Sequence, residues 1–341
     1  MMQSNKWVKL AALALVVGAV LAPVASASAA SEPDVIIGYE NNGADPYMVS
    51  MGEKLFEKHI KGNVEYKMFS SGPAAMSALA SNSLNFMCGL GVPPLTTAIS
   101  QGLPMTIVYN QERYTQAAGI VVKPDSGIKD VAGLAGHKIA IVAGSQASFE
   151  LATFLAEAKV PYSAVTQINM APPQMRTSWV TGNIDAAIVW DPVFSALREA
   201  GGKVIKTDAD LPRTASSYNV CIANAKWAQA HPDLVRGFVA ALDEGYQATN
   251  KDPEKSLQVM AQQTGVTVPM ARTQLAGYEI FSGKDQTSEN VMGSGKGVES
   301  SATYQTLVNT AKVLQQIGRI QSPISDFHAN VAPQYAEFLS H

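Results

Sequence analysis

Residue types that can bind a small polar ligand recur in this sequence directly after short apolar segments that are typical of β-strands. Most of them are small, polar or aromatic, and few are cationic. Such side chains suit a small ligand held by hydroxyls, amides and backbone N–H groups. The strand ends concerned are Glu40-Asn41-Asn42, Ser70-Ser71-Gly72, Gly91-Val92-Pro93, Asn110-Gln111-Glu112, Gly144-Ser145-Gln146 and Trp190-Asp191-Pro192.

Two of these strand ends place glycine and hydroxyl groups where a helix is predicted to begin, at Ser70-Ser71-Gly72 and at Gly144-Ser145-Gln146. The first N–H groups of a helix have no intrahelical acceptor and its N-terminus bears a partial positive charge, so an anion can bind there without an arginine. Ordinary helix capping explains the same residues. Because the pattern occurs twice, we weigh capping and anion binding equally.

Three other side chains at strand ends have two interpretations each. Trp190 fits the hydrophobic core or a platform for a ligand, and the core is the commoner place for an indole. Asp191 precedes Pro192 and fits a helix cap or a ligand contact equally well. Glu40 follows an apolar strand directly, where it is either a solvated loop residue or an acceptor for a ligand ammonium group.

Strands and helices alternate along the chain in two cycles, which predicts an α/β fold of parallel strands with crossover helices. The first cycle begins at Val35, and its first helix is predicted over residues 46–60. The second begins near Ala118. One strand, 217–224, then returns, and only helices are predicted beyond it. We therefore expect a first lobe of residues 31–117 plus 216–341, a second lobe of residues 118–215, and a hinge at residues 117–120 and 213–219.

The N-terminus predicts secretion. Two lysines precede an apolar segment of twelve residues, Leu10–Leu21, which is too short to span a bilayer and is followed by small residues. Residues 1–30 therefore fit a cleaved signal peptide, and without a cysteine near the cleavage site we expect a periplasmic protein with no lipid anchor. Its loss changes the net charge from −3 to −5, because residues 1–30 contain two lysines and no acid. This charge argues against nucleic acid as a partner. The candidate cleavage sites follow Ala27, Ala29 and Ala30.

Cysteine and histidine usage gives little sign of metal or catalytic chemistry. Cys88 and Cys221 lie 133 positions apart in strand-like segments, and they fit a disulfide or, with more precedent, two buried free cysteines. Gly144-Ser145-Gln146 lacks the G-x-S-x-G pattern of a nucleophilic serine, so a hydrolase is a remote alternative. The histidines have no metal-ligand spacing, and we expect neither a metal nor a cofactor: His59, His137, His231, His328 and His341.

Three segments, residues 69–108, 130–160 and 179–197, resemble the periplasmic substrate-binding components of ABC importers of the nitrate, sulfonate and taurine group, most of all taurine-binding proteins. The most specific part is the segment GNIDAAIVWDP at 182–192. The resemblance implies a two-lobed periplasmic binding-protein fold, type II-like, with a ligand cleft between the lobes and no catalytic activity. It also implies that a monomer captures a small sulfonate, taurine or a related aliphatic sulfonate, and delivers it to ABC permease subunits in the inner membrane.

Matched position by position, the resemblance implies these ligand-binding residues: Glu40, Ser71, Gly72, Val92, Ser145, Gln146, Trp190, Asp191 and Asn219. The sequence departs from the taurine-type pattern at Gly91-Val92-Pro93, which lacks hydroxyls, and at Asn219, where relatives tend to have an aspartate. Sulfonates as a class are therefore more firmly implied than taurine. Nitrate, bicarbonate, a thiamine-precursor pyrimidine and an aromatic acid stay open as ligands, and Trp190 and Tyr39 could stack on a pyrimidine.

Overall fold

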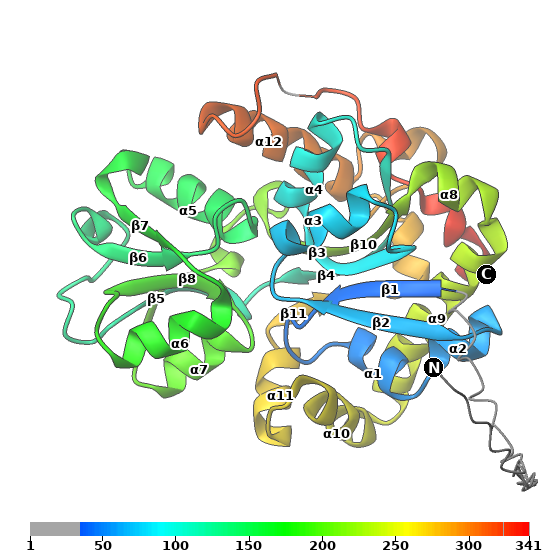
Figure 1. Cartoon of the computed structure of the whole chain (residues 1–341), viewed down its shortest axis with the longest axis horizontal. Helices are drawn as coiled ribbons and strands as arrows, with labels where there is room; N and C mark the ends of the chain where they lie inside the picture. Colours follow the sequence, from blue (N-terminus) through cyan, green and yellow to red (C-terminus); the bar gives the residue numbers. More distant parts are fainter. Residues whose placement is uncertain (1–34, 323, 341) are drawn as a thin grey trace, which may run out of the picture. The chain divides into compact units, whose positions relative to one another are not determined.

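The computed structural model describes residues 35–322 and 324–340, so the predicted signal peptide at 1–30 lies outside the described residues. Two β-sheets are covered by helices (Figure 1). Both sheets belong to one compact unit that extends from Pro33 to His341. Among the described helices, none is both long and apolar enough to cross a membrane.

The six-stranded sheet has the order β11-β4-β10-β3-β1-β2. β1 pairs in parallel with β2 and β3, whereas β10 returns from the second sheet and lies antiparallel between β3 and β4. The prediction that only helices follow β10 is wrong, because a short strand, β11, pairs with the end of β4. The strands are β1 (Val35–Glu40), β2 (Val64–Phe69), β3 (Phe86–Gly91), β4 (Met105–Tyr114), β10 (Tyr218–Asn224) and β11 (Tyr278–Ile280).

The five-stranded sheet has the order β7-β6-β8-β5-β9. β6 pairs in parallel with β7 and β8, while β5 is antiparallel to β8 and β9. One apolar core cluster gathers side chains from these strands and from three helices. The elements are β5 (Ala118–Val122), β6 (Lys138–Ile141), α5 (Gln146–Glu157), β7 (Thr166–Asn169), α6 (Pro172–Val180), β8 (Ala186–Trp190), α7 (Val193–Glu199) and β9 (Lys203–Thr207).

Helices cover both faces of the six-stranded sheet (Figure 1). One face packs on α1 (Pro46–Gly52), α2 (Leu55–Ile60), α9 (Pro232–Lys251) and α10 (Pro253–Thr264), and the other on α3 (Gly72–Ala80), α4 (Val92–Ser100) and α12 (Ala302–Gln316). The single helix predicted over 46–60 is interrupted, because Lys54 adopts the left-handed conformation with φ 57°. The remaining helices are α8 (Ala225–Ala230) and α11 (Val268–Leu275).

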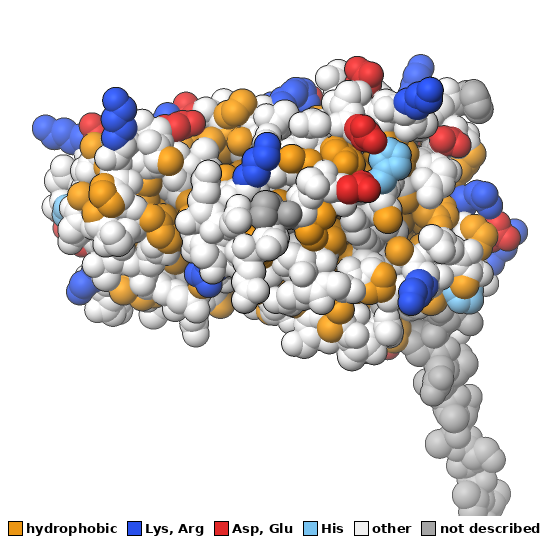
Figure 2. Space-filling view, turned by 90° about the horizontal axis from the view of Figure 1, so that it is seen from above, with side chains coloured by type: hydrophobic (Ala, Val, Ile, Leu, Met, Phe, Trp, Pro, Cys, Tyr) orange, Lys and Arg blue, Asp and Glu red, His pale blue; other side chains and the backbone are white. Residues whose placement is uncertain are grey.

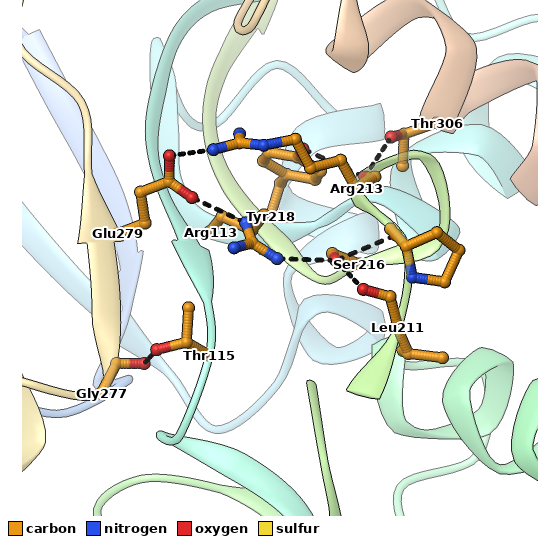
Figure 3. A network of polar contacts seen from close by, with 10 residues as sticks. Arg113, Thr115, Leu211, Arg213, Ser216, Tyr218, Gly277, Glu279 and Thr306 are labelled. Atoms are coloured by element: carbon orange, nitrogen blue, oxygen red, sulfur yellow. Dashed lines mark hydrogen bonds and ion pairs between the residues drawn. The ribbon is translucent and has the colours of Figure 1, made fainter. Parts of the chain in front are cut away.

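The chain passes between the sheets twice, after β4 and before β10, and one polar network holds both passages (Figure 3). The carboxylate of Glu279 in β11 accepts a hydrogen bond from Arg113 Nε at 2.8 Å and another from Arg213. Arg113 also donates to Ser216 Oγ at 3.1 Å. Arg113 lies in β4 just before the first passage, and Arg213 and Ser216 belong to the second, so Glu279 ties the two together.

Cys88 and Cys221 form a disulfide between the neighbouring strands β3 and β10. The expectation of free cysteines is therefore wrong. Cys88 and Cys221 are neighbours in the sheet although they are 133 positions apart in the sequence. The chain between them includes β4 and the whole second sheet, and β10 then returns to lie beside β3.

Charged side chains of both signs are scattered among uncharged and apolar groups over the face shown in Figure 2. Within the described residues, no group of three or more His, Cys, Asp or Glu is placed to hold a metal ion.

Candidate functional site

A cavity lies where the ends of β1, β3 and β10 face the start of α5 and the end of β8. Its empty volume is about 380 Å³, including the part open to solvent. The six-stranded sheet and its connections supply Glu40, Asn42, Gly72, Gly89, Gly91, Pro94, Tyr114, Ser217, Tyr218 and Asn219, and the second sheet and its connections supply Ala118, Ser145, Gln146, Ala147, Glu150 and Trp190.

Glycines let the two sides of the cavity approach each other. A side chain at Gly91 would bring its Cβ to 3.1 Å from the Cβ of Gln146. At Gly72, a Cβ would lie 3.2 Å from Glu40 Oε1. The end of β3 at Gly91 therefore lies very close to the start of α5, and this contact closes the cavity at that point.

Glu40 projects into the cavity from the end of β1 without a partner. Its side chain is buried, and its Oε1 has no hydrogen-bond partner among the described residues. Burial raises the pKa of Glu40 well above its usual range, because the charged form loses hydration that nothing replaces. The surroundings of Glu40 therefore favour its protonated form.

Asn219 presents an acceptor to the cavity. Its Nδ2 donates to Glu112 Oε1 at 2.6 Å and to the Tyr114 hydroxyl at 3.1 Å, which uses both amide hydrogens. Asn219 lines the cavity, and its side-chain oxygen remains as an acceptor. Behind it, burial and the nearby Asp45 carboxyl raise the pKa of Glu112 well above its usual range.

The two serines at helix starts differ in what they bind. Ser145 caps α5, because its Oγ accepts from Ala147 N at 3.2 Å while donating to Val142 O at 2.8 Å. Ser71 stands at the same position before α3, but its buried hydroxyl makes no capping hydrogen bond. The Ser71 hydroxyl is therefore not used for capping, and Ser71 lies next to Gly72, which lines the cavity.

Most of the predicted binding residues meet at this cavity. Glu40, Gly72, Ser145, Gln146, Trp190 and Asn219 line it, while Ser71, Val92 and Asp191 are buried but are not among its lining residues. Val92 begins α4, whose next two residues are prolines, so this helix start has fewer N–H groups to offer than the others.

Asp191 acts within its own connection. Its Oδ1 accepts a hydrogen bond from Ser195 N in α7 at 2.8 Å, and its own N–H donates to Ala117 O at 2.9 Å. Of the two interpretations of Asp191, the structure shows the one in which it caps the helix. Burial raises the pKa of Asp191 to about 6, although the Ser195 hydrogen bonds oppose this shift.

Sequence reasoning missed several lining residues, among them Gly89, Tyr114, Ser217 and Glu150. Glu150 had a signal that could have found it, because it lies four residues after Gln146 on a helix and so shares the same face. Tyr114 and Ser217 had none, because β4 is longer than its apolar segment and Ser217 precedes a strand instead of following one.

Curated relatives are named for sulfonates. The chain is 27% identical over 250 residues to the putative aliphatic sulfonates-binding protein of Escherichia coli (strain K12), covering 73% of this chain and 77% of that protein. It is 24% identical over 311 residues to the taurine-binding periplasmic protein of the same strain, covering 89% and 93%.

Solved structures confirm the predicted α/β periplasmic binding-protein fold. The alkanesulfonate-binding protein SsuA from Xanthomonas axonopodis pv. citri, bound to MOPS, matches with a TM-score of 0.73 and 20% identity over 87% of this chain and 98% of that one. The desulfurization enzyme DSZB matches with a TM-score of 0.62 and 14% identity over 89% and 98%. At such identities the likeness shows the fold alone. The family described as NMT1/THI5 like matches residues 63–256, which is more than half of the sequence, and the chain belongs to that family.

Proposed function

We propose that this protein is a periplasmic solute-binding protein that captures a small sulfonate, taurine or a related aliphatic sulfonate, and delivers it to an ABC permease. The observation that carries the proposal is the cavity closed between the two sheets, on a fold shared with sulfonate-binding proteins. The names of the relatives support the ligand class.

Groups that can bind an anion belong to two helix starts at this cavity. The N–H groups of Gly72 and Gln146 are the first of α3 and α5 and have no intrahelical acceptor. The Ser71 hydroxyl adds a third donor, and Glu40 in its neutral form can donate a fourth hydrogen bond from beside Gly72. A sulfonate, with three oxygens, matches this set without a cationic side chain.

We propose that the two sheets belong to two lobes, residues 31–117 plus 216–341 and residues 118–215, that close over the ligand. The chain passes between the sheets at two places, and both sheets contribute to the cavity wall. Ligand binding then shifts the population from open to closed forms, and the closed surface is what a permease recognises. Residues 1–30 serve as the signal peptide in this proposal, which N-terminal sequencing of the exported protein checks.

We propose binding without catalysis. The fold is shared with a desulfurization enzyme, so a nucleophile deserves consideration. Both cysteines are consumed in the disulfide, and the Ser145 hydroxyl donates to a main-chain carbonyl rather than to a base. Among the residues lining the cavity in the described chain there is no histidine.

A thermal-shift and calorimetry screen of the purified protein tests the proposal. The ligands are taurine, ethanesulfonate, nitrate, bicarbonate, an aminopyrimidine and benzoate. A sulfonate is expected to raise the melting temperature, because a ligand at 100 times its Kd stabilises the native state by about 2.7 kcal/mol. A higher melting temperature with nitrate alone, or with the pyrimidine alone, would assign the protein to that ligand class. No shift with any sulfonate would overturn the proposal.

A further inference from the structure

We propose that Glu150 determines specificity by binding a protonated amine on the ligand, so that the cavity selects aminosulfonates over sulfonates that lack an amine. This inference rests on the proposed function and narrows its substrate class.

Glu150 lies on the wall of the cavity that belongs to the second sheet. It is one helical turn after Gln146 in α5, its side chain is 2% exposed, and it lines the cavity. Ser217, at the passage into β10, donates its hydroxyl to Glu150 Oε1. The carboxyl is thus held in place by a residue of the opposite wall and has a defined position in the closed cavity.

The cavity offers Glu150 no cationic partner. None of the side chains lining it in the described chain is Lys, Arg or His. The guanidinium that lies in the nearest network, Arg113, is already hydrogen-bonded to Glu279 and Ser216. Asp208, whose pKa is raised by burial and by the Glu150 carboxyl, is a fully buried acid and supplies no positive charge. A negative charge on Glu150 therefore needs a positive charge from the ligand.

Glu150 is the acid that can carry this charge, because the two acids lining the cavity have different surroundings. No donor faces Glu40 Oε1, and burial raises the pKa of Glu40 well above its usual range. Burial also raises the pKa of Glu150, but hydrogen bonds from Ser217 and Gln146 oppose the shift and leave it at about 7. Of the two acids, Glu150 is the one whose carboxylate is supported by hydrogen bonds.

Further acceptors complete a subsite for an ammonium group, which has three N–H donors. The side-chain oxygen of Asn219 faces the cavity because its amide hydrogens are taken by Glu112 and Tyr114. Gln146 Oε1 is buried and has no partner among the described residues. Together with Glu150, these oxygens match the three donors of an ammonium, while the donors at Ser71 and Gly72 belong to the other end of the ligand.

The test compares two ligands that differ by one group, 2-aminoethanesulfonate and ethanesulfonate, on the full mature protein by calorimetry. The wild type is expected to bind the amino compound at least tenfold more tightly. In Glu150→Gln, which keeps an acceptor for Ser217, this preference is expected to fall at least tenfold while ethanesulfonate binds as before. Glu157→Gln, on the exposed side of the same helix, is the matched control and should keep the wild-type preference.

Each outcome separates this inference from the proposed function. If the wild type binds both sulfonates equally, or if Glu150→Gln weakens both equally, the inference is overturned and sulfonate binding stands. If neither sulfonate binds and another ligand class does, both proposals are overturned. Should Glu150→Gln fail to fold, the wild type alone decides: its preference for the amine must shrink as pH falls below about 7, where Glu150 becomes protonated, and a constant preference would refute the inference.

Discussion

At the scale of single residues, Ser145 and Ser71 both precede a helix but differ in their hydrogen bonds. Ser145 satisfies the start of α5 with its own hydroxyl. Ser145→Ala is therefore expected to lower the free energy of unfolding by about 1 kcal/mol, the usual cost of losing a helix cap. Urea denaturation measures this loss. An unchanged unfolding midpoint would contradict the capping role.

Ser71→Ala is expected to weaken ligand binding and to leave the free energy of unfolding almost unchanged. Its hydroxyl makes no capping hydrogen bond, so stability should change by less than about 0.5 kcal/mol. If the hydroxyl binds the sulfonate, ligand affinity should fall by about 1–3 kcal/mol, or roughly 5- to 150-fold. Calorimetry with the best-binding sulfonate measures it, and Ser145→Ala serves as the comparison. Equal affinity of Ser71→Ala and the wild type would remove Ser71 from the site.

The sequence located the ends of strands from which these side chains come, but it could not assign their tasks. Both serines precede a predicted helix, and whether a hydroxyl turns to its own helix or to a ligand depends on local backbone geometry that residue type does not specify. The same holds for Asp191, which hydrogen-bonds to Ser195 N. Glu150 was missed because it belongs to a helix interior, where an acid is ordinarily solvated.

At the scale of elements, the cavity depends on how closely the end of β3 approaches α5. A Cβ at Gly91 would lie 3.1 Å from Gln146 Cβ, closer than most such contacts allow. Gly91→Ala should therefore hinder the closed arrangement by at least about 1 kcal/mol and weaken ligand binding about fivefold or more. Calorimetry measures the affinity of the variant.

Gly133→Ala is the control for this prediction. It places the new Cβ at 3.5 Å or more from its nearest neighbours, in a short 3₁₀ turn away from the cavity. Its ligand affinity should equal that of the wild type. If Gly91→Ala also binds as the wild type does, the contact between β3 and α5 does not limit closure.

The disulfide also connects two elements, because it joins β3 to β10, the strand that returns beside it. Cross-linking residues so far apart in the chain restricts the unfolded state, and natural disulfides contribute about 2–5 kcal/mol. Cys88→Ala/Cys221→Ala should lower the free energy of unfolding by that amount. Reduction of the wild type should give a similar loss in urea denaturation. A double variant as stable as the oxidised wild type would show that the bond is dispensable.

At the scale of the whole molecule, the sequence predicted the strand and helix alternation well because apolar period and turn residues are local signals. It predicted neither that β10 lies between β3 and β4 nor that β11 exists. β11 has only three residues, and its identity as a strand comes from pairing with β4 rather than from its own composition. The disulfide was not predicted for the same reason, because it depends on β10 lying beside β3.

Several buried acids give the molecule an unusual dependence of stability on pH. Burial raises the pKa of Asp45 and of Glu150 to about 7, that of Asp191 to about 6, and those of Glu40, Glu112 and Asp208 further. The pKa of Glu279 shifts in the opposite direction: hydrogen bonds from Arg213 and Arg113 outweigh the effect of burial and lower it. Between about pH 4 and pH 7 the folded state therefore binds more protons than the unfolded state.

A folded state that binds more protons loses stability as pH rises, so the ligand-free protein is expected to be more stable at pH 5 than at pH 8. The shift of Glu150 alone, from 4.5 to about 7, corresponds to about 3 kcal/mol. Urea denaturation at pH 5, 6, 7 and 8 measures the trend, and Glu150→Gln should reduce its slope because the titrating group is gone. A free energy of unfolding that is flat or increases over this range would mean that these carboxyls are hydrated or paired with cations in solution, and the cavity would then not be the closed, acid-lined site from which amine recognition was inferred.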